Sequence, residues 1–454
     1  MAASFGERAL AEVHEAGLDQ LLNELSEFYP ASIGKRLLFG VPIIDDLLKV
    51  FMQRPSNVST DAETGQMQNT VSAETILTED DEVLLRCSQD DQAIFGGEDL
   101  IEMGSSSNSP TMSMTTTARE PVPVVEISSS LSGAGKTQLL YHMVAKAILP
   151  RRFLNVDVGG LETAVVWIDT DDRLDVHRLQ LVARAIFHDA WKDVKTENET
   201  ENLGHLSDSQ VSEVLTLCLQ HVHVFRPQSS TALLATLAQL DHYLYDLSRH
   251  YSASRRLHTV IIDSATAFLW QDKLRDDIAR TDEIGQSRME IEGRRQLKQS
   301  FHLSDLYADI VSELKRLQDL FGCAIVYTTT VSSGRFSTST SSGPPGLYDR
   351  PPTSTPSLRP ALPAPWGLFP TLRLVVHRGT VRPFPPAMSA HDARKDASMR
   401  QGIVQQGKFS AWVNAWGQED WPRRVVDGVH WHNGGCFSFY VRATGVEIPT
   451  SYNG

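Results

Sequence analysis

Residues 122–150 read VPVVEISSSLSGAGKTQLLYHMVAKAILP, and this stretch indicates a strand, a glycine-rich turn and a helix in succession. The turn approaches the phosphate-binding pattern G-x-x-x-x-G-K-[ST], but Ser130 stands where the first glycine is expected. A serine can occupy that position if its φ remains negative. The alternative is a chance Gly-Lys-Thr in a surface turn, and the flanking strand and helix favour the phosphate loop over it.

The pattern predicts an ATP and Mg²⁺ site for a physical reason. Backbone N–H groups of the turn and the start of the helix converge on phosphate oxygens, and the helix dipole favours negative charge there. Lys136 is expected to face the β- and γ-phosphates, and the Thr137 hydroxyl to bind Mg²⁺. The predicted nucleotide-binding residues are Ser130, Gly133, Ala134, Gly135, Lys136, Thr137 and Gln138.

Two further strands end in acidic residues. LHTVIID (257–263) ends in Asp263, which we expect to hold Mg²⁺ through water. VVWIDTDD (165–172) ends in Asp169, Asp171 and Asp172, one of which could orient an attacking water. Spacing alone fits an exposed acidic turn equally well.

Apolar runs alternate with helical patterns through the middle of the chain. This alternation predicts an α/β fold with a mostly parallel sheet and helices on both faces. The expected strands are 124–127, 163–168, 221–225, 258–262 and 323–328, and the expected helices are 41–52, 137–148, 175–192, 230–249 and 303–320. Alternating patterns at 371–378, 407–416 and 436–448 predict an antiparallel extension.

Composition limits the class of protein. No run of eighteen apolar residues or secretory signal pattern occurs, so we expect no membrane association. The four cysteines are widely spaced, which fits reduced thiols in the cytosol or nucleus. The net charge is −14, yet residues 55–118 contain twelve acidic residues and one basic residue, so the rest of the chain is near −3. Nucleic-acid binding by that remainder is not excluded.

The segments GAGKTQLLYHMVAKAILP, VVWIDTDDRLDVHRL, VIIDSATAFLW, LQDLFGCAIVYTTTV and SFYVRATGVEI stand in the order found in RecA-type recombinase cores. In these segments the chain resembles the eukaryotic recombinase paralogues. The resemblance implies a nuclear, ATP-binding subunit of a hetero-oligomeric paralogue complex, acting in homologous-recombination repair of DNA double-strand breaks. It also implies contact with single-stranded or branched DNA, either directly or through the complex.

With the resemblance, five segments are expected along the chain. They are an N-terminal helical segment (1–52), an acidic disordered insertion (53–120), a RecA-like ATP-binding core (121–331), a Ser/Pro-rich disordered loop (332–366) and C-terminal strands completing the core (367–454).

The sequence departs from the active recombinases at three positions. Asp171 takes the place of the family's catalytic glutamate and is one methylene shorter, and a small displacement of a positioned group costs rate steeply. Thr330 takes the place of the glutamine that senses the γ-phosphate, and Ser130 is the third departure. The resemblance therefore implies weak or absent ATP turnover, and leaves open a weak DNA-dependent ATPase activity.

Two other functions remain open. An autonomous P-loop ATPase or small-molecule kinase would need an arginine-bearing lid, and DSATAF after the Mg²⁺ strand argues against it. A scaffold subunit would bind no nucleotide.

Residues 270–300 match a DNA-facing loop of the family. Their basic residues are equalled in number by acidic ones, which also fits an exposed charged helix. The basic candidates are Lys273, Arg275, Arg280, Arg288, Arg294, Arg295 and Lys298.

Deleting residues 55–118 is expected to leave the core folded, because an acidic segment poor in aromatic residues adds no packed surface. Thermal unfolding of the deletion variant tests this, and a large loss of thermal stability would contradict it. The shortened chain is also expected to bind single-stranded DNA better at low salt.

Overall fold

The computed structural model describes residues 39–52, 122–154, 156–197, 207–296, 300–331, 355–379, 384–385 and 387–449. The expected N-terminal helix before residue 39 and the acidic insertion at 53–120 lie outside these residues and stay predictions. No helix within the described ranges has the length and apolar character needed to span a lipid bilayer.

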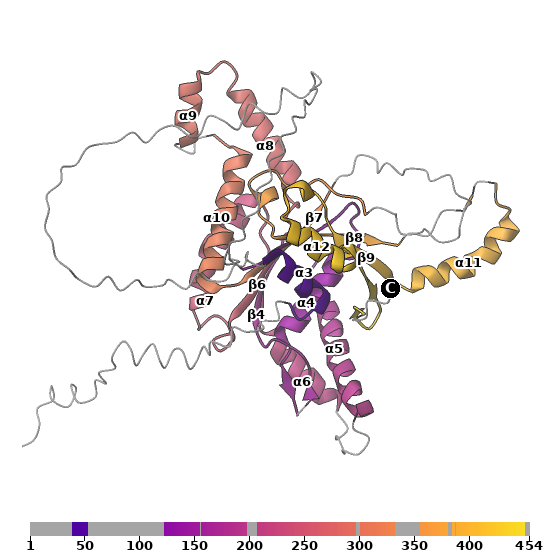
Figure 1. Ribbon diagram of the computed structural model, residues 1–454. Coiled ribbons are helices and arrows are strands. Elements are labelled where there is room, and N and C mark those ends of the chain that lie inside the picture. Colours follow the sequence, from indigo (N-terminus) through magenta and orange to yellow (C-terminus); the bar gives the residue numbers. More distant parts are fainter. Residues whose placement is uncertain are drawn as a thin grey trace, which may run out of the picture. The chain divides into compact units, whose positions relative to one another are not determined.

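One nine-stranded sheet runs through the described chain in the order β11-β10-β9-β8-β1-β7-β6-β4-β5 (Figure 1). Its strands are β1 (Val124–Ser129), β4 (Ala164–Asp169), β5 (Val222–Phe225), β6 (Leu257–Asp263), β7 (Ala324–Thr330), β8 (Leu372–Arg378), β9 (Lys408–Val413), β10 (Phe437–Val441) and β11 (Val446–Glu447). A separate two-stranded ribbon consists of β2 (Arg152–Phe153) and β3 (Val156–Asp157).

Pairing is parallel from β8 through β1, β7, β6 and β4 to β5. The antiparallel extension is confirmed for β9, β10 and β11. For residues 371–378, which form β8, the expectation is wrong on one side, because β8 pairs with β1 in parallel and only with β9 in antiparallel orientation. The chain between β7 and β8 is long enough for the crossover that a parallel pair requires.

A buried ion pair accompanies the register of β1 and β8. Glu126 and Arg373 are direct partners across the two strands, and Arg373 Nε lies 3.5 Å from Glu126 Oε2. On the other side of β1, Thr329 Oγ1 donates to Glu126 Oε1 at 2.8 Å. Burial raises the pKa of Glu126, and these two partners act in the opposite direction. A shift of one residue would turn these side chains to the other face of the sheet.

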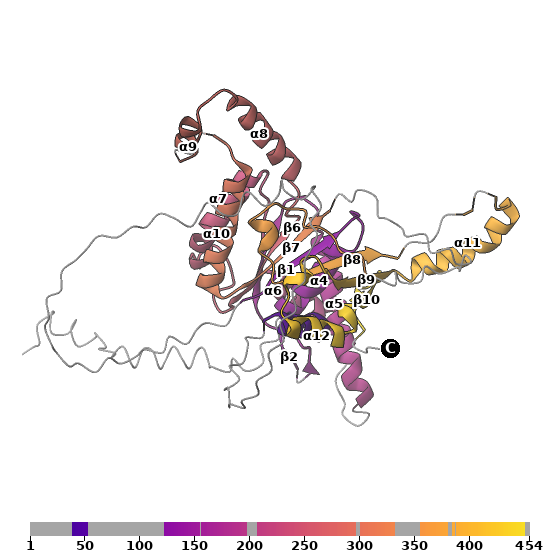
Figure 2. The ribbon, with the colours of Figure 1, turned by 45° about the horizontal axis from the view of Figure 1, so that its top comes forward.

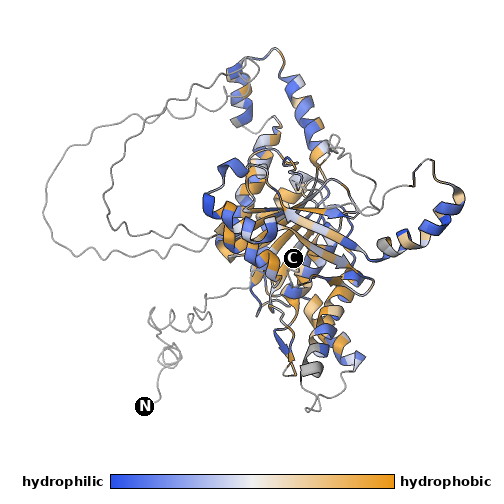
Figure 3. Ribbon diagram, turned by 45° about the vertical axis from the view of Figure 1, so that its right-hand side comes forward, coloured by the Kyte–Doolittle hydropathy of each residue, from blue (hydrophilic) through white to orange (hydrophobic). Residues whose placement is uncertain are grey.

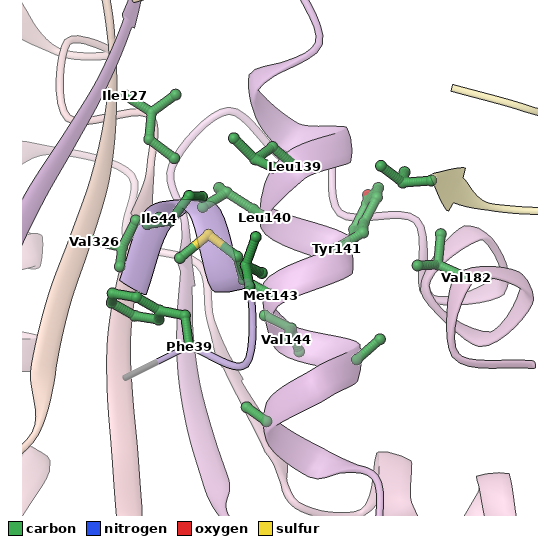
Figure 4. Packing of buried hydrophobic residues seen from close by; sticks show 14 of the residues in the cluster. Phe39, Ile44, Ile127, Leu139, Leu140, Tyr141, Met143, Val144, Val182 and Val326 are labelled. Carbon is green, nitrogen blue, oxygen red and sulfur yellow. The ribbon is translucent and has the colours of Figure 1, made fainter. Parts of the chain in front are cut away.

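Helices cover both faces of the sheet, as the alternation predicted (Figure 2). On one face, α4 packs between the strands, α3 and α5, with Ile127 and Val326 of the sheet beside Ile44 of α3 (Figure 4). On the other face, α7 and α10 pack against β6 and β7. The helices are α3 (Pro42–Met52), α4 (Lys136–Ile148), α5 (Val176–Glu197), α6 (Asp208–Leu219), α7 (Ser230–Tyr245), α8 (Leu269–Asp282), α9 (Arg288–Gln296), α10 (Leu303–Phe321), α11 (Ala390–Gln405) and α12 (Arg423–Trp431).

The described end of the Ser/Pro-rich segment, residues 355–366, packs against the core although it forms no helix or strand before Trp366. Asn414 exchanges two hydrogen bonds with the backbone of Leu358, of 2.9 and 2.7 Å, and Trp412 Nε1 donates to Pro356 O at 3.1 Å. Trp366, which begins a short 3₁₀ helix, is 1% exposed. The expectation of a disordered loop is therefore wrong for residues 355–366, and the rest of that loop lies outside the described residues.

A buried histidine cluster lies beside the edge strand β5. Ser252 Oγ bonds both His221 Nδ1 at 2.9 Å and His223 Nε2 at 3.0 Å, and His223 Nδ1 bonds the Tyr243 hydroxyl at 3.0 Å. The rings of His223 and His250 lie 5.0 Å apart. Burial, with the neighbouring positive charges, lowers the pKa of both His221 and His223 to about 4.

The contribution of His221 and His223 to stability is expected to fall as the pH drops from about 6.5 to about 4, because both bind protons in the unfolded chain before they do so in the folded one. Denaturant unfolding across this range is the measurement. His223→Gln should flatten the decline relative to the unmodified protein, whereas His430→Gln, at an exposed position, should not. Equal slopes for all three proteins would contradict the cluster's role.

Candidate nucleotide-binding site

The phosphate loop links β1 to α4 at the carboxyl edge of the sheet. Gly135 precedes the first helical residue with φ at +96°, a conformation that favours glycine. A Cβ at this position would lie 2.8 Å from the Phe409 ring of β9. Gly133 is exposed, with open space where a Cβ would stand, and Ala134 is buried.

Lys136 is buried at the centre of this edge. Its ammonium donates to Ser129 Oγ at 2.6 Å and to Thr330 Oγ1 at 3.1 Å. Burial lowers the pKa of Lys136 to about 8, although the charges of Asp263 and Asp171 act against that shift. Two hydroxyls are weak compensation for a buried cation, so the site favours an anion.

The start of α4 also fits an anion. The helix has no side-chain cap and no acidic residue in its first turn. Its N-terminal N–H groups therefore have no carboxylate or hydroxyl acceptor from a capping residue. Together with Lys136, this donor set matches the phosphates of a nucleotide.

Oxygen ligands for Mg²⁺ lie next to the loop. Thr137 Oγ1 donates to Asp263 Oδ2 at 2.8 Å, and Thr328 Oγ1 donates to Asp263 Oδ1 at 2.5 Å. Burial raises the pKa of Asp263, and these hydrogen bonds and Lys136 oppose the rise. A hydroxyl and a carboxylate side by side are ligands that Mg²⁺ accepts.

The geometry distinguishes the three acidic residues after β4. Asp169 is buried and accepts the Arg173 and Leu174 N–H groups at 3.0 and 3.1 Å. Arg226 pairs with both Asp169, at 3.4 Å, and Asp172, at 3.1 Å. Asp171 is exposed. Its negative charge opposes the lowering of the Lys136 pKa by burial and adds to the raising of the Asp263 pKa. Asp169 and Asp172 thus hold the turn, and Asp171 is the carboxylate that remains for the site.

Gln138 is held from outside the loop. Its Oε1 accepts from Arg178 Nε at 2.9 Å, and the same guanidinium donates to the carbonyls of Arg442 and Ala443, each at 2.7 Å. The start of α4 is thereby tied to α5 and to the turn between β10 and β11. No hydrogen bond of the Ser130 side chain appears among the described contacts.

Sequence reasoning missed a set of hydroxyls that joins the strand ends. Thr170 Oγ1 donates to Ser264 O at 2.7 Å and accepts from Ser264 N at 2.6 Å. Ser264 Oγ contacts Thr266 Oγ1 at 2.9 Å, and Thr266 Oγ1 accepts from Thr330 N at 3.2 Å. The small hydroxyl residues after Asp169 and Asp263 were the signal that could have found them.

Most of the described part of residues 270–300 lies in α8 and α9, and several cations there have intramolecular partners. Arg280 pairs with Asp276 at 2.8 Å, Arg295 pairs with Asp305, and Lys273 lies 4.9 Å from the Trp270 ring centre. Lys298 lies outside the described residues. These contacts favour the exposed charged helix over a basic DNA-binding loop.

The fold and the arrangement of this edge are those of a RecA-like core. No protein-family model matches the chain. It is 28% identical over 204 residues to a protein named DNA repair protein XRCC2 homolog from Arabidopsis thaliana, covering 43% of this chain and 50% of the relative. It is 31% identical over 142 residues to the DNA repair protein XRCC2 of Mus musculus, covering 31% and 40%.

By sequence, the chain is XRCC2-like. The matches span at most about half the length of these relatives.

Gly135→Ala is expected to destabilise the protein by about 1–3 kcal/mol, because it combines a positive φ with a clash against Phe409. Gly133→Ala, where a methyl group meets open space, should change stability by less than about 0.5 kcal/mol. Denaturant unfolding of both variants makes the comparison. Equal losses would mean that Phe409 does not constrain the loop.

Proposed function

We propose that this protein is an ATP-binding subunit of a recombinase-paralogue complex that supports homologous-recombination repair of DNA double-strand breaks in the nucleus. The observation that carries the nucleotide role is the buried Lys136 ammonium at the uncapped start of α4, whose hydrogen bonds among the described residues go to the Ser129 and Thr330 hydroxyls. The repair role rests on the relatives, both of which are named as DNA repair proteins.

ATP and Mg²⁺ fit the residues at this edge. Lys136 and the N–H groups from Gly133 to Gln138 would hold the phosphates, with Ser130 and Ala134 shaping the loop. Thr137 Oγ1 and Asp263 Oδ2 lie 2.8 Å apart. Thr137 would bind the metal directly and Asp263 would hold it through water. Mg²⁺ would supply charge neutralisation between the phosphates.

Turnover by the chain is proposed to be weak. Asp171 is exposed and one methylene shorter than glutamate, so a water that it held would be poorly fixed. Thr330 Oγ1 accepts a hydrogen bond from Lys136, and the short threonine side chain lacks the amide group with which a glutamine would contact a γ-phosphate. ATP then acts by occupancy, favouring one docking state of a partner to the extent that its affinity differs between the two states.

The proposed partners are other recombinase paralogues and, directly or through them, single-stranded or branched DNA. An autonomous ATPase or small-molecule kinase and a nucleotide-free scaffold are the alternatives, and the experiments below separate them.

Lys136→Ala is expected to abolish ATP binding, because it removes the charge that faces the phosphates. Equilibrium binding of ATP with Mg²⁺ to the purified chain is the test. Lys49→Ala, at an exposed lysine of α3 paired with Asp46, is the matched control and should bind normally. Thr137→Val should weaken only the Mg²⁺-dependent part. Absence of ATP binding by the unmodified chain would favour the scaffold.

Asp171→Glu is expected to leave ATP binding nearly unchanged and to raise hydrolysis modestly, and more so together with Thr330→Gln. Single-turnover hydrolysis by the chain, alone and with its partner, is the measurement. Brisk turnover by the unmodified chain alone would replace the occupancy model with an autonomous ATPase. Partner affinity that is indifferent to ATP, without turnover, would again favour the scaffold.

A further inference from the structure

The connection between β8 and β9 has a charge opposite to that of the whole chain. From Gly379 to Gly407 the sequence contains four lysine and arginine residues and two aspartates, a net charge of +2, whereas the full chain carries −14. Helix α11 occupies the middle of this connection and is mostly hydrophilic (Figure 3). Its cations are therefore concentrated in a chain that is otherwise acidic.

One face of α11 contains no acidic and no apolar side chain. At 100° per residue, seven positions of the helix fall within a sector of about 120°. All seven are exposed, and the Ser398 hydroxyl donates to the Lys395 carbonyl within the same face at 3.4 Å. The seven residues are His391, Arg394, Lys395, Ser398, Gln401, Gly402 and Gln405. We call this surface the α11 basic face.

Both aspartates of α11 are held away from that face. Asp392 forms the helix cap with Ser389, whose hydroxyl donates to Asp392 Oδ2 at 2.7 Å and accepts from Asp392 N at 3.1 Å. Asp396 pairs with Arg400 at 3.4 Å, and the Arg400 guanidinium lies 4.3 Å from the Phe384 ring centre. The negative charges of the helix are thus bound locally, whereas Arg394 and Lys395 remain exposed on the α11 basic face.

We infer that the α11 basic face binds the phosphate backbone of nucleic acid. Arginine, lysine, serine and glutamine are the side chains that contact phosphates without reading sequence. The face extends about 21 Å from His391 to Gln405, enough to follow several phosphates of one strand. A protein partner would need an apolar centre, and the face has none. The identification of the ligand as nucleic acid rests on the proposed repair function. The charge and exposure of the α11 basic face are observed independently of that function.

The test compares two double substitutions in the full-length chain. Arg394→Gln with Lys395→Gln removes the two cations of the face. Arg423→Gln with Arg424→Gln removes two adjacent, exposed arginines at the start of α12 and changes the net charge equally. The probes are fluorescein-labelled oligothymidylate and a labelled duplex of mixed sequence, titrated at low and moderate salt.

The α11 pair is expected to weaken binding of both probes about five- to tenfold at low salt. It should also reduce the slope of log K against log salt by about 1.4–1.8, as two lost phosphate contacts require. The α12 pair should change affinity less than twofold. Equal losses of DNA affinity from both pairs would mean that the effect comes from net charge and not from the α11 basic face, which would overturn the proposal. The proposal would also fail if the α11 pair lost no affinity or if the unmodified chain did not bind DNA.

The chain's own acidic segment is the competing occupant. Carbodiimide coupling of Lys395 to carboxylates within residues 55–118, unaffected by added DNA, would assign the face to that segment and overturn the proposal. ATP binding should be normal in both double variants. Failure of the nucleotide site would instead appear as ATP binding unchanged by Lys136→Ala, so the two proposals fail in different measurements.

Discussion

Strand β1 pairs in parallel with β7 on one side and with β8 on the other, and the phosphate loop leaves from its carboxyl end. Parallel strands place their carboxyl ends on the same edge of a sheet, which is why chemistry from distant parts of the sequence meets there. Lys136 can reach Ser129 and Thr330 because β1 and β7 end side by side. Pairing on both sides also fixes the position of the carboxyl end of β1, where the loop begins.

The edge is continuous rather than a set of separate groups. A chain of hydrogen bonds runs from Thr170 through Ser264 and Thr266 to the backbone N–H of Thr330. The Thr330 hydroxyl in turn accepts a hydrogen bond from Lys136. The acidic turn is connected to the loop a second time, because Arg173 donates to Ser132 Oγ at 3.2 Å. Strand ends three positions apart in the sheet therefore share one polar network.

The sequence predicted what depends on local pattern. The five central strands and the helices after them follow from apolar periodicity, and the proximity of Lys136, Thr137 and Asp263 follows from a known loop pattern at a shared edge. It did not predict α6, α11 or α12. Helix α11 has few apolar residues, whereas α6 buries Val211, Leu215 and Cys218 and α12 buries Val425 and Val429, both at helical spacing, so these two short helices could have been found. The parallel pairing of β8 was missed because strand direction depends on a long-range partner. Spacing alone did not separate Asp171 from Asp169 and Asp172; the family resemblance singled it out, and the pairing of Arg226 with the other two carboxylates adds a structural reason.

The ion pair between Glu126 and Arg373 joins the strand of the phosphate loop to a part of the chain nearly 250 residues later. A chain that ended before β8 would leave a buried carboxylate without its cation, at a cost of about 3–5 kcal/mol. It would also expose one hydrogen-bonding edge of β1 and remove Phe409 from beside the loop. Premature termination between residues 331 and 371 would therefore damage the candidate nucleotide site itself, even though every residue of that site would still be translated.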